Sequence, residues 1–290
     1  MLAAATGCRG DASSTPAGDR VFVVTTSNVF ADLIVRTGGE HVEVRSLVPP
    51  GVDVHTYVAK PADLRALGDA DLVILNGLGL DDWLAETIQA SGTDAPLLRL
   101  AEDLEGVELI EGEGDEAGEP NPHLWLDVQL ARAYVDRVVG ALSQLKPGAV
   151  SDLQESHGAY VRTLEDLDAW VREQVAMIPE ANRKLVMFHD AFPYFARAYG
   201  LEVVGVAVDA PGQDPSAGEI AALVDAIRAS GVKAIFSEDQ FPTTVLDRLA
   251  QETGTSVIAN LFDDSLDGET VDSYEAMIRW DVEQMVDALR

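Results

Sequence analysis

The stretch that decides the fold runs from Ser151 to Met177 and reads SDLQESHGAYVRTLEDLDAWVREQVAM. Its first four residues form a capping-box pattern with an acidic residue in the first turn, which is typical of a helix start. Only Gly158 interrupts a run that otherwise lacks glycine and proline. About 26 helical residues at 1.5 Å each would extend roughly 40 Å, the span of a whole domain. The stretch therefore predicts one long helix that joins two separate lobes.

On both sides of this helix, short β-branched segments alternate with segments of helical character. The expected strands lie at 21–26, 42–48, 71–75, 184–188, 203–208, 234–236 and 256–260. Such alternation is typical of α/β lobes, each with a central, mostly parallel sheet flanked by helices. We expect a leader remnant and tether at 1–20, an N-terminal lobe at 21–150, the linking helix at 151–178 and a C-terminal lobe at 179–290.

The charge of the chain is strongly negative. Fifty acidic residues against 20 basic ones give a net charge of −30, which repels phosphate backbones and excludes a nucleic-acid partner. A field of this sign attracts cations, although most of these carboxylates are expected to be solvated surface groups. The segment 102–120 is rich in Glu, Asp and Gly, and we expect an exposed acidic loop there.

The single cysteine, Cys8, lies near the start of the chain in MLAAATGCRG. Small residues that lead into Gly-Cys resemble the end of a bacterial lipoprotein signal, in which this cysteine would carry the lipid. The polar stretch Arg9 to Arg20 then suits a flexible tether. We expect a protein anchored to the outer face of the cell membrane, or periplasmic. The alternative is an incidental thiol, because no basic segment or full apolar stretch precedes Cys8.

Three of the five histidines share a position at the end of an expected strand or in the loop after it. These three are His55, His123 and His189, and ligands of open α/β sheets bind at that edge. We expect the other two, His41 and His157, to be solvated surface residues. No helical His pair or other local metal motif is present. From the residues alone, the three loop histidines could be metal ligands or structural side chains.

Several segments together resemble the zinc- and manganese-binding receptors of bacterial ABC importers. They are Gly51 to Pro61, NGLGLDDWL at 76–84, NPHLWLD at 121–127, Phe188 to Tyr194 and LFDDSL at 261–266. The resemblance implies two lobes bridged by one long helix and four metal ligands, two from each lobe. By motif position these ligands are His55, His123, His189 and Asp264. Asp263, beside Asp264, leaves an ambiguity of one residue.

The resemblance also implies the role: delivery of Zn(II) to the permease of an ABC importer by a monomeric receptor. Imidazole nitrogen suits zinc, and relatives specialised for manganese usually carry a carboxylate where this chain has His189. Mn(II) is the alternative cargo. A zinc-dependent hydrolase is a further alternative, but no HExxH or Gly-x-Ser-x-Gly motif supports an enzyme. Candidate acceptors for the ligating imidazoles are Asp53, Asp127, Asp190 and Glu238.

Overall fold

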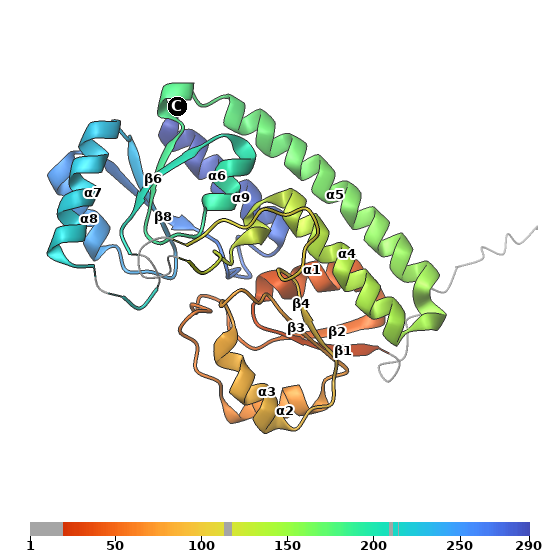
Figure 1. Cartoon of the computed structure of the whole chain (residues 1–290). Helices are drawn as coiled ribbons and strands as arrows, with labels where there is room; N and C mark the ends of the chain where they lie inside the picture. Colours follow the sequence, from red (N-terminus) through yellow and green to blue (C-terminus); the bar gives the residue numbers. More distant parts are fainter. Residues whose placement is uncertain (1–19, 113–117, 209–210, 214) are drawn as a thin grey trace, which may run out of the picture.

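A computed structural model describes residues 20–112, 118–208, 211–213 and 215–290. The expected lipidation site Cys8 and nearly all of the tether lie outside these residues, as does the centre of the acidic segment. Figure 1 shows two lobes with a long helix, α5, that runs along both of them. Within the described residues, no helix combines the length and the apolar character needed to cross a membrane.

The N-terminal lobe contains a four-stranded sheet in which every neighbouring pair is parallel. Its strand order is β2-β1-β3-β4, with β1 Val21–Thr25, β2 Val42–Ser46, β3 Leu72–Leu75 and β4 Leu97–Arg99. The helices of this part of the chain are α1 Asn28–Gly38, α2 Pro61–Asp69, α3 Ala85–Ser91 and α4 Val128–Leu145. The sequence pattern did not predict β4, because this edge strand has only three residues and none of them is fully buried.

The C-terminal lobe repeats the same strand order. Its parallel sheet runs β6-β5-β7-β8, with β5 Lys184–Met187, β6 Glu202–Val206, β7 Ala234–Glu238 and β8 Ser256–Leu261. The accompanying helices are α6 Pro193–Tyr199, α7 Ala217–Ser230, α8 Thr244–Thr253 and α9 Tyr274–Leu289. The predicted fold class, two α/β lobes with mostly parallel sheets and one linking helix, is therefore confirmed.

The linking helix α5 spans Val150–Ala176, a length of 27 residues. The helix starts one residue before the predicted start, but Ser151 lies inside it and does not form the expected cap. A short 3₁₀ turn, Pro147–Ala149, runs directly into α5, and the residue at the cap position makes no side-chain hydrogen bond. The fixed φ of proline favours such a turn, and Pro147 itself has no backbone N–H group to satisfy.

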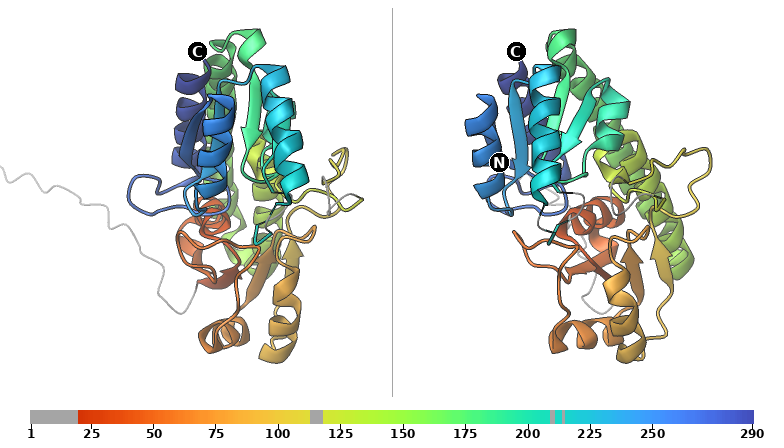
Figure 2. Two further views of the ribbon diagram at one scale, coloured as in Figure 1. Left: turned by 90° about the vertical axis from the view of Figure 1, so that its left-hand side faces the viewer. Right: turned by 60° about the vertical axis from the view of Figure 1, so that its left-hand side comes forward.

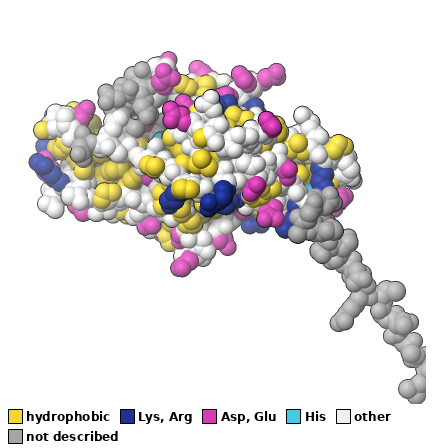
Figure 3. All heavy atoms as spheres, turned by 90° about the horizontal axis from the view of Figure 1, so that it is seen from below, with side chains coloured by type: hydrophobic (Ala, Val, Ile, Leu, Met, Phe, Trp, Pro, Cys, Tyr) yellow, Lys and Arg dark blue, Asp and Glu magenta, His cyan; other side chains and the backbone are white. Residues whose placement is uncertain are grey.

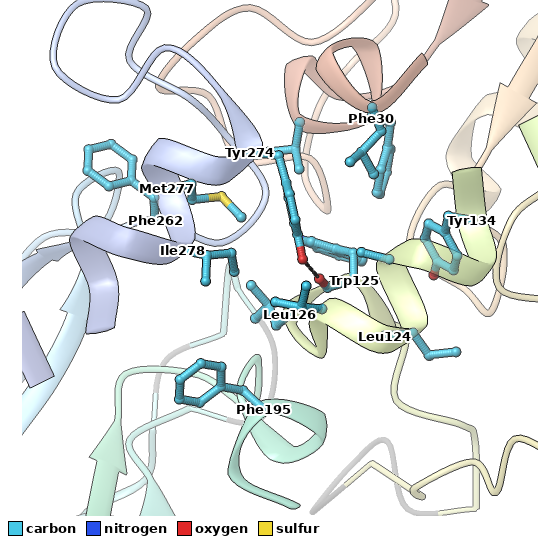
Figure 4. Close-up of a cluster of buried hydrophobic side chains, with 14 of the residues drawn as sticks. Phe30, Leu124, Trp125, Leu126, Tyr134, Phe195, Phe262, Tyr274, Met277 and Ile278 are labelled. Carbon is cyan, nitrogen blue, oxygen red and sulfur yellow. Dashed lines mark hydrogen bonds between the residues drawn. The ribbon is translucent and has the colours of Figure 1, made fainter. Parts of the chain in front are cut away.

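The two lobes share one hydrophobic core (Figure 4). Trp125, in the short 3₁₀ helix Leu124–Leu126 just before α4, packs edge-to-face on Phe30 of α1 with ring centroids 5.0 Å apart. The hydroxyl of Tyr274, the first residue of α9, donates to the carbonyl oxygen of Trp125 at 2.7 Å. The indole nitrogen of Trp125 in turn donates to the carbonyl oxygen of Asp263 at 2.7 Å. Both views in Figure 2 show the lobes stacked directly on each other, as this shared core requires.

The acidic charge is spread over the surface, as Figure 3 shows for one face of the molecule. Acidic side chains lie there singly among neutral and apolar groups. A different group of carboxylates is fully buried where the lobes meet, and it consists of Glu238, Asp263 and Asp264. Burying a carboxylate costs free energy of folding unless a cation or hydrogen-bond donors compensate its charge. This buried group therefore indicates a candidate functional site.

Candidate metal centre

His55 and His123 approach each other at the carboxyl edge of the first sheet. His55 lies in the loop after β2, where Asp53 accepts a hydrogen bond from its backbone nitrogen at 2.9 Å. His123 directly precedes a short 3₁₀ helix, Leu124–Leu126, and is only 2% exposed. The Nε2 atoms of the two rings are 3.3 Å apart. Two imidazole nitrogens at this separation can bind one ion.

His189 completes the group from the other lobe. It follows β5 and is 1% exposed, and its ring centroid lies 5.8 Å from that of His55 and 5.3 Å from that of His123. One ligand nitrogen from each of the three histidines lies within 4.8 Å of the other two. The three loop histidines singled out by the sequence therefore converge, although they are far apart in the chain.

Carboxylates flank His189 on both sides. Its Nδ1 lies 3.4 Å from Oε1 of Glu238, and its Nε2 lies 3.3 Å from Oδ2 of Asp263. Glu238 is the last residue of β7, and both acids are 0% exposed. Of the four candidate acceptors named from the sequence, Glu238 is the one that faces an imidazole nitrogen. A carboxylate this close to one ring nitrogen of a metal-binding histidine can orient the ring.

Asp264 reaches across to the opposite lobe. Its Oδ2 accepts from the backbone nitrogen of Val54 at 3.1 Å, next to His55, and an oxygen of Asp264 lies within 4.8 Å of ligand atoms of Asp53 and His55. Its Oδ1 accepts from Nε2 of Gln240 at 3.1 Å. The structure thus places Asp264 at the edge of the histidine cluster, on the side of His55.

Asn121 is a functional residue that the sequence reasoning missed. Its Oδ1 lies 3.0 Å from the backbone nitrogen of His123 and 3.1 Å from Nδ1 of the same ring. Its Nδ2 donates to the carbonyl oxygen and to Oδ2 of Asp190, beside His189, at 2.6 and 3.0 Å. One amide therefore orients a histidine of one lobe and holds the loop of the other. The Asn-Pro-His sequence at 121–123 could have indicated this role, because it places an amide two residues before the histidine.

The remaining candidate acceptors have other partners. Asp127 caps α4 by accepting from the backbone nitrogen of Gln129, and the side chain of Asp190 accepts from Asn121. Asp53 accepts from the backbone nitrogen of His55, not from its ring. Short polar side chains next to helix starts and tight turns commonly satisfy backbone donors, as Asp127 and Asp53 do here.

The pKa values of the site follow from burial and charge. Burial, together with the positive charge of His189, lowers the pKa of His55 to about 4. Burial also acts to lower the pKa of His189, but the carboxylates of Glu238 and Asp263 outweigh it and raise this pKa to about 9. The pKa of Asp264 is raised well above its usual value by burial and by the charge of Asp263. A divalent cation among these groups would relieve the carboxylate repulsion and the cost of burial.

A cavity of about 600 Å³ opens beside His55. The loops at the carboxyl edge of the first sheet form its walls, and the acidic residues among them are Asp82, Glu102 and Glu119. His55 is only partly buried, whereas His123 and His189 are fully buried. The cavity therefore gives the site its access to solvent from the side of His55.

The two histidines expected at the surface lie away from the site, but they are not simply solvated. His41 is 7% exposed, and its Nε2 lies 3.3 Å from Oδ2 of Asp152 in α5. His157 lies 2.7 Å from Oδ1 of Asp136 in α4. The prediction of solvated residues was wrong because α5 packs over this part of the N-terminal lobe and buries one flank of each ring.

The fold and the site together define a class of protein, a two-lobed binding protein with clustered histidines between its lobes. The chain belongs to the ZnuA family, described as the zinc-uptake complex component A, periplasmic, whose family model matches residues 23–288. This family supplies binding components of importers, so the chain is a metal-binding receptor and not an enzyme. The hydrolase alternative is thereby excluded.

Individual relatives differ in the metal that their names give. The chain is 32% identical to the manganese-binding lipoprotein MntA of Bacillus subtilis, over 99% of this chain and 95% of the relative. It is also 32% identical to the zinc-binding protein TroA of Treponema pallidum, over 94% of this chain and 90% of that protein. The solved structure of TroA superposes with a TM-score of 0.84 and 31% identity, covering 93% of this chain and 99% of that chain.

Proposed function

We propose that this protein captures Zn(II) outside the cytoplasm and delivers it to the permease of an ABC importer. The observation that carries the proposal is the convergence of three imidazoles from two lobes, His55, His123 and His189, within 4.8 Å. With Asp264 as the fourth ligand, the set has three nitrogens and one carboxylate, and zinc commonly binds such donors. No ligand comes from the long helix α5, which leaves the loops free to adjust around the metal.

Mn(II) is the alternative cargo in the same role. It is supported by the manganese-binding relatives and by the carboxylates that surround His189. Zinc is favoured because nitrogen donors outnumber oxygen donors in the proposed ligand set, whereas manganese prefers oxygen.

The proposed receptor acts as a monomer that is held at the outer face of the membrane by a lipid on Cys8. The relatives include lipoproteins of metal importers, which supports this anchor. The polar residues 9–20 would then act as a tether between the lipid and the folded lobes. Mass spectrometry of protein from its native membrane tests the lipid, and light scattering tests the monomer.

Calorimetric titration of four alanine variants tests the ligand set. We expect His55→Ala, His123→Ala, His189→Ala and Asp264→Ala each to weaken zinc binding by more than about 100-fold, because losing a direct ligand costs more than losing an outer partner. His157→Ala is the matched control, since this histidine of α5 pairs with Asp136 of α4, outside the cluster. Wild-type affinity in His123→Ala would remove that residue from the ligand set and refute the proposal in this form.

A further inference from the structure

Asp263 is a second buried carboxylate beside the proposed fourth ligand. It follows β8 and is 0% exposed. Its Oδ1 accepts from Nε2 of Gln240 at 2.8 Å. Its Oδ2 has no hydrogen-bond partner among the described residues and lies 3.3 Å from Nε2 of His189. A buried oxygen without a donor is costly, so this atom requires a cation or a proton nearby.

The spacing of the donors points to a metal as that partner. Metal–ligand bonds of about 2.0 to 2.1 Å place neighbouring donors roughly 2.8 to 3.4 Å apart at angles from about 90° to the tetrahedral value. The Nε2 atoms of His55 and His123 are 3.3 Å apart, and Oδ2 of Asp263 lies at the same distance from Nε2 of His189. Both pairs therefore have the separation of donors that share one ion.

Gln240 holds the two aspartates as a unit. Its Nε2 donates to Oδ1 of Asp263 at 2.8 Å and to Oδ1 of Asp264 at 3.1 Å. Asp264 also accepts from the backbone nitrogen of Val54, so each of its oxygens already has one donor. Each carboxylate oxygen keeps a further lone pair for a metal, and Oδ2 of Asp263 is the oxygen still without a donor.

We propose that Oδ2 of Asp263 is an additional donor to the transported metal, beside Asp264. The inference rests on the proposed receptor function and deepens it. The complete set is then three imidazoles and two carboxylates, oriented by Gln240 on one side and by Glu238 behind His189. Manganese prefers oxygen donors, so a second carboxylate raises the affinity of the site for manganese. Asp263 would therefore allow the site to bind manganese as well as zinc.

The test is Asp263→Asn, in which the amide oxygen can still accept from Gln240 but the charged donor is gone. Asp239→Asn is the matched control, because it removes one exposed carboxylate close by in the sequence. Competition titration is expected to show zinc affinity lower by at least about tenfold and manganese affinity lower by at least about 100-fold. The control should leave both affinities unchanged.

A spectroscopic measurement separates a donor from a structural residue. With Co(II) as the probe, visible d–d bands gain intensity when five donors become four. We expect this gain in Asp263→Asn and not in Asp239→Asn. If Asp263→Asn does not fold, Asp263→Ser provides the same comparison with a smaller side chain.

Two outcomes overturn different statements. In one outcome, a folded Asp263→Asn protein keeps the wild-type zinc affinity, manganese affinity and Co(II) spectrum, while His123→Ala abolishes binding. Asp263 is then not a donor, and the receptor function stands. If wild-type protein binds neither zinc nor manganese, the receptor function itself fails.

Discussion

The amide of Asn121 offers the sharpest test of how the two lobes cooperate at the site. We predict that Asn121→Ala weakens zinc binding although Asn121 is not a ligand. The change removes the acceptor that faces Nδ1 of His123, so the ring is free to rotate and to adopt the other tautomer. It also removes the two hydrogen bonds that Nδ2 donates to Asp190, next to His189. Two ligands from different lobes therefore lose their orientation together.

The size of the effect follows from the contacts. Outer partners of metal-binding histidines contribute about 10- to 100-fold to affinity, which sets the expected loss for Asn121→Ala. Four hydrogen-bond contacts at roughly 1 kcal/mol each set an upper bound near 4 kcal/mol for the loss of folding stability of the metal-free protein. The stabilisation that added zinc provides should also shrink, because it depends on affinity.

Calorimetric titration with zinc and thermal unfolding with and without zinc measure both quantities. Asn182→Ala is the control, since this side chain makes a single hydrogen bond to the backbone of Leu289, away from the site. We expect it to leave zinc affinity unchanged. Wild-type affinity in a destabilised Asn121→Ala protein would refute the reasoning, because the amide would then support the fold without orienting His123.

Three further predictions concern the acidic loop, motion and pH. Deleting Gly112 to Gly118 should leave zinc affinity within a few-fold in titration at physiological salt, because carboxylates in water bind zinc weakly. Solution scattering should show no domain-scale compaction on adding zinc, because the lobes already share a core; a large compaction would show that α5 bends. Zinc affinity should rise about tenfold per pH unit between roughly pH 7 and 9, because the metal displaces the proton of His189, whose pKa is about 9. In Glu238→Gln, zinc affinity should depend less on pH over this range, because the negative charge that raises the pKa of His189 is gone.

Much of the fold was predictable because its patterns are local. The run up to Met177, with Gly158 as its one helix-breaking residue, indicated the long helix, and β-branched runs indicated the strands that lie buried in each sheet. The cap of α5 was predicted incorrectly, and the strand β4 was not predicted. Both depend on packing: a proline turn replaced the expected cap, and β4 pairs with a neighbour despite its short length.

The site was only partly predictable. Strand ends indicated where His55, His123 and His189 would lie, since carboxyl ends of parallel strands meet at one edge. The contacts that orient these rings join residues far apart in the chain, and no sequence spacing reports them. Gln240 illustrates this, because its link to the two aspartates exists only when β7 and β8 are paired.

The shared core also has a consequence for how the chain folds during synthesis. Asp32 of α1 accepts a hydrogen bond from the backbone nitrogen of Tyr274, and Asn28 exchanges two hydrogen bonds with Leu266, so the first helix is completed by some of the last residues made. Contacts this distant in sequence form slowly, because a long loop must close first. The N-terminal lobe therefore cannot finish folding while the ribosome still holds the C-terminus. The first helix therefore gains these partners only after nearly the whole chain has been made.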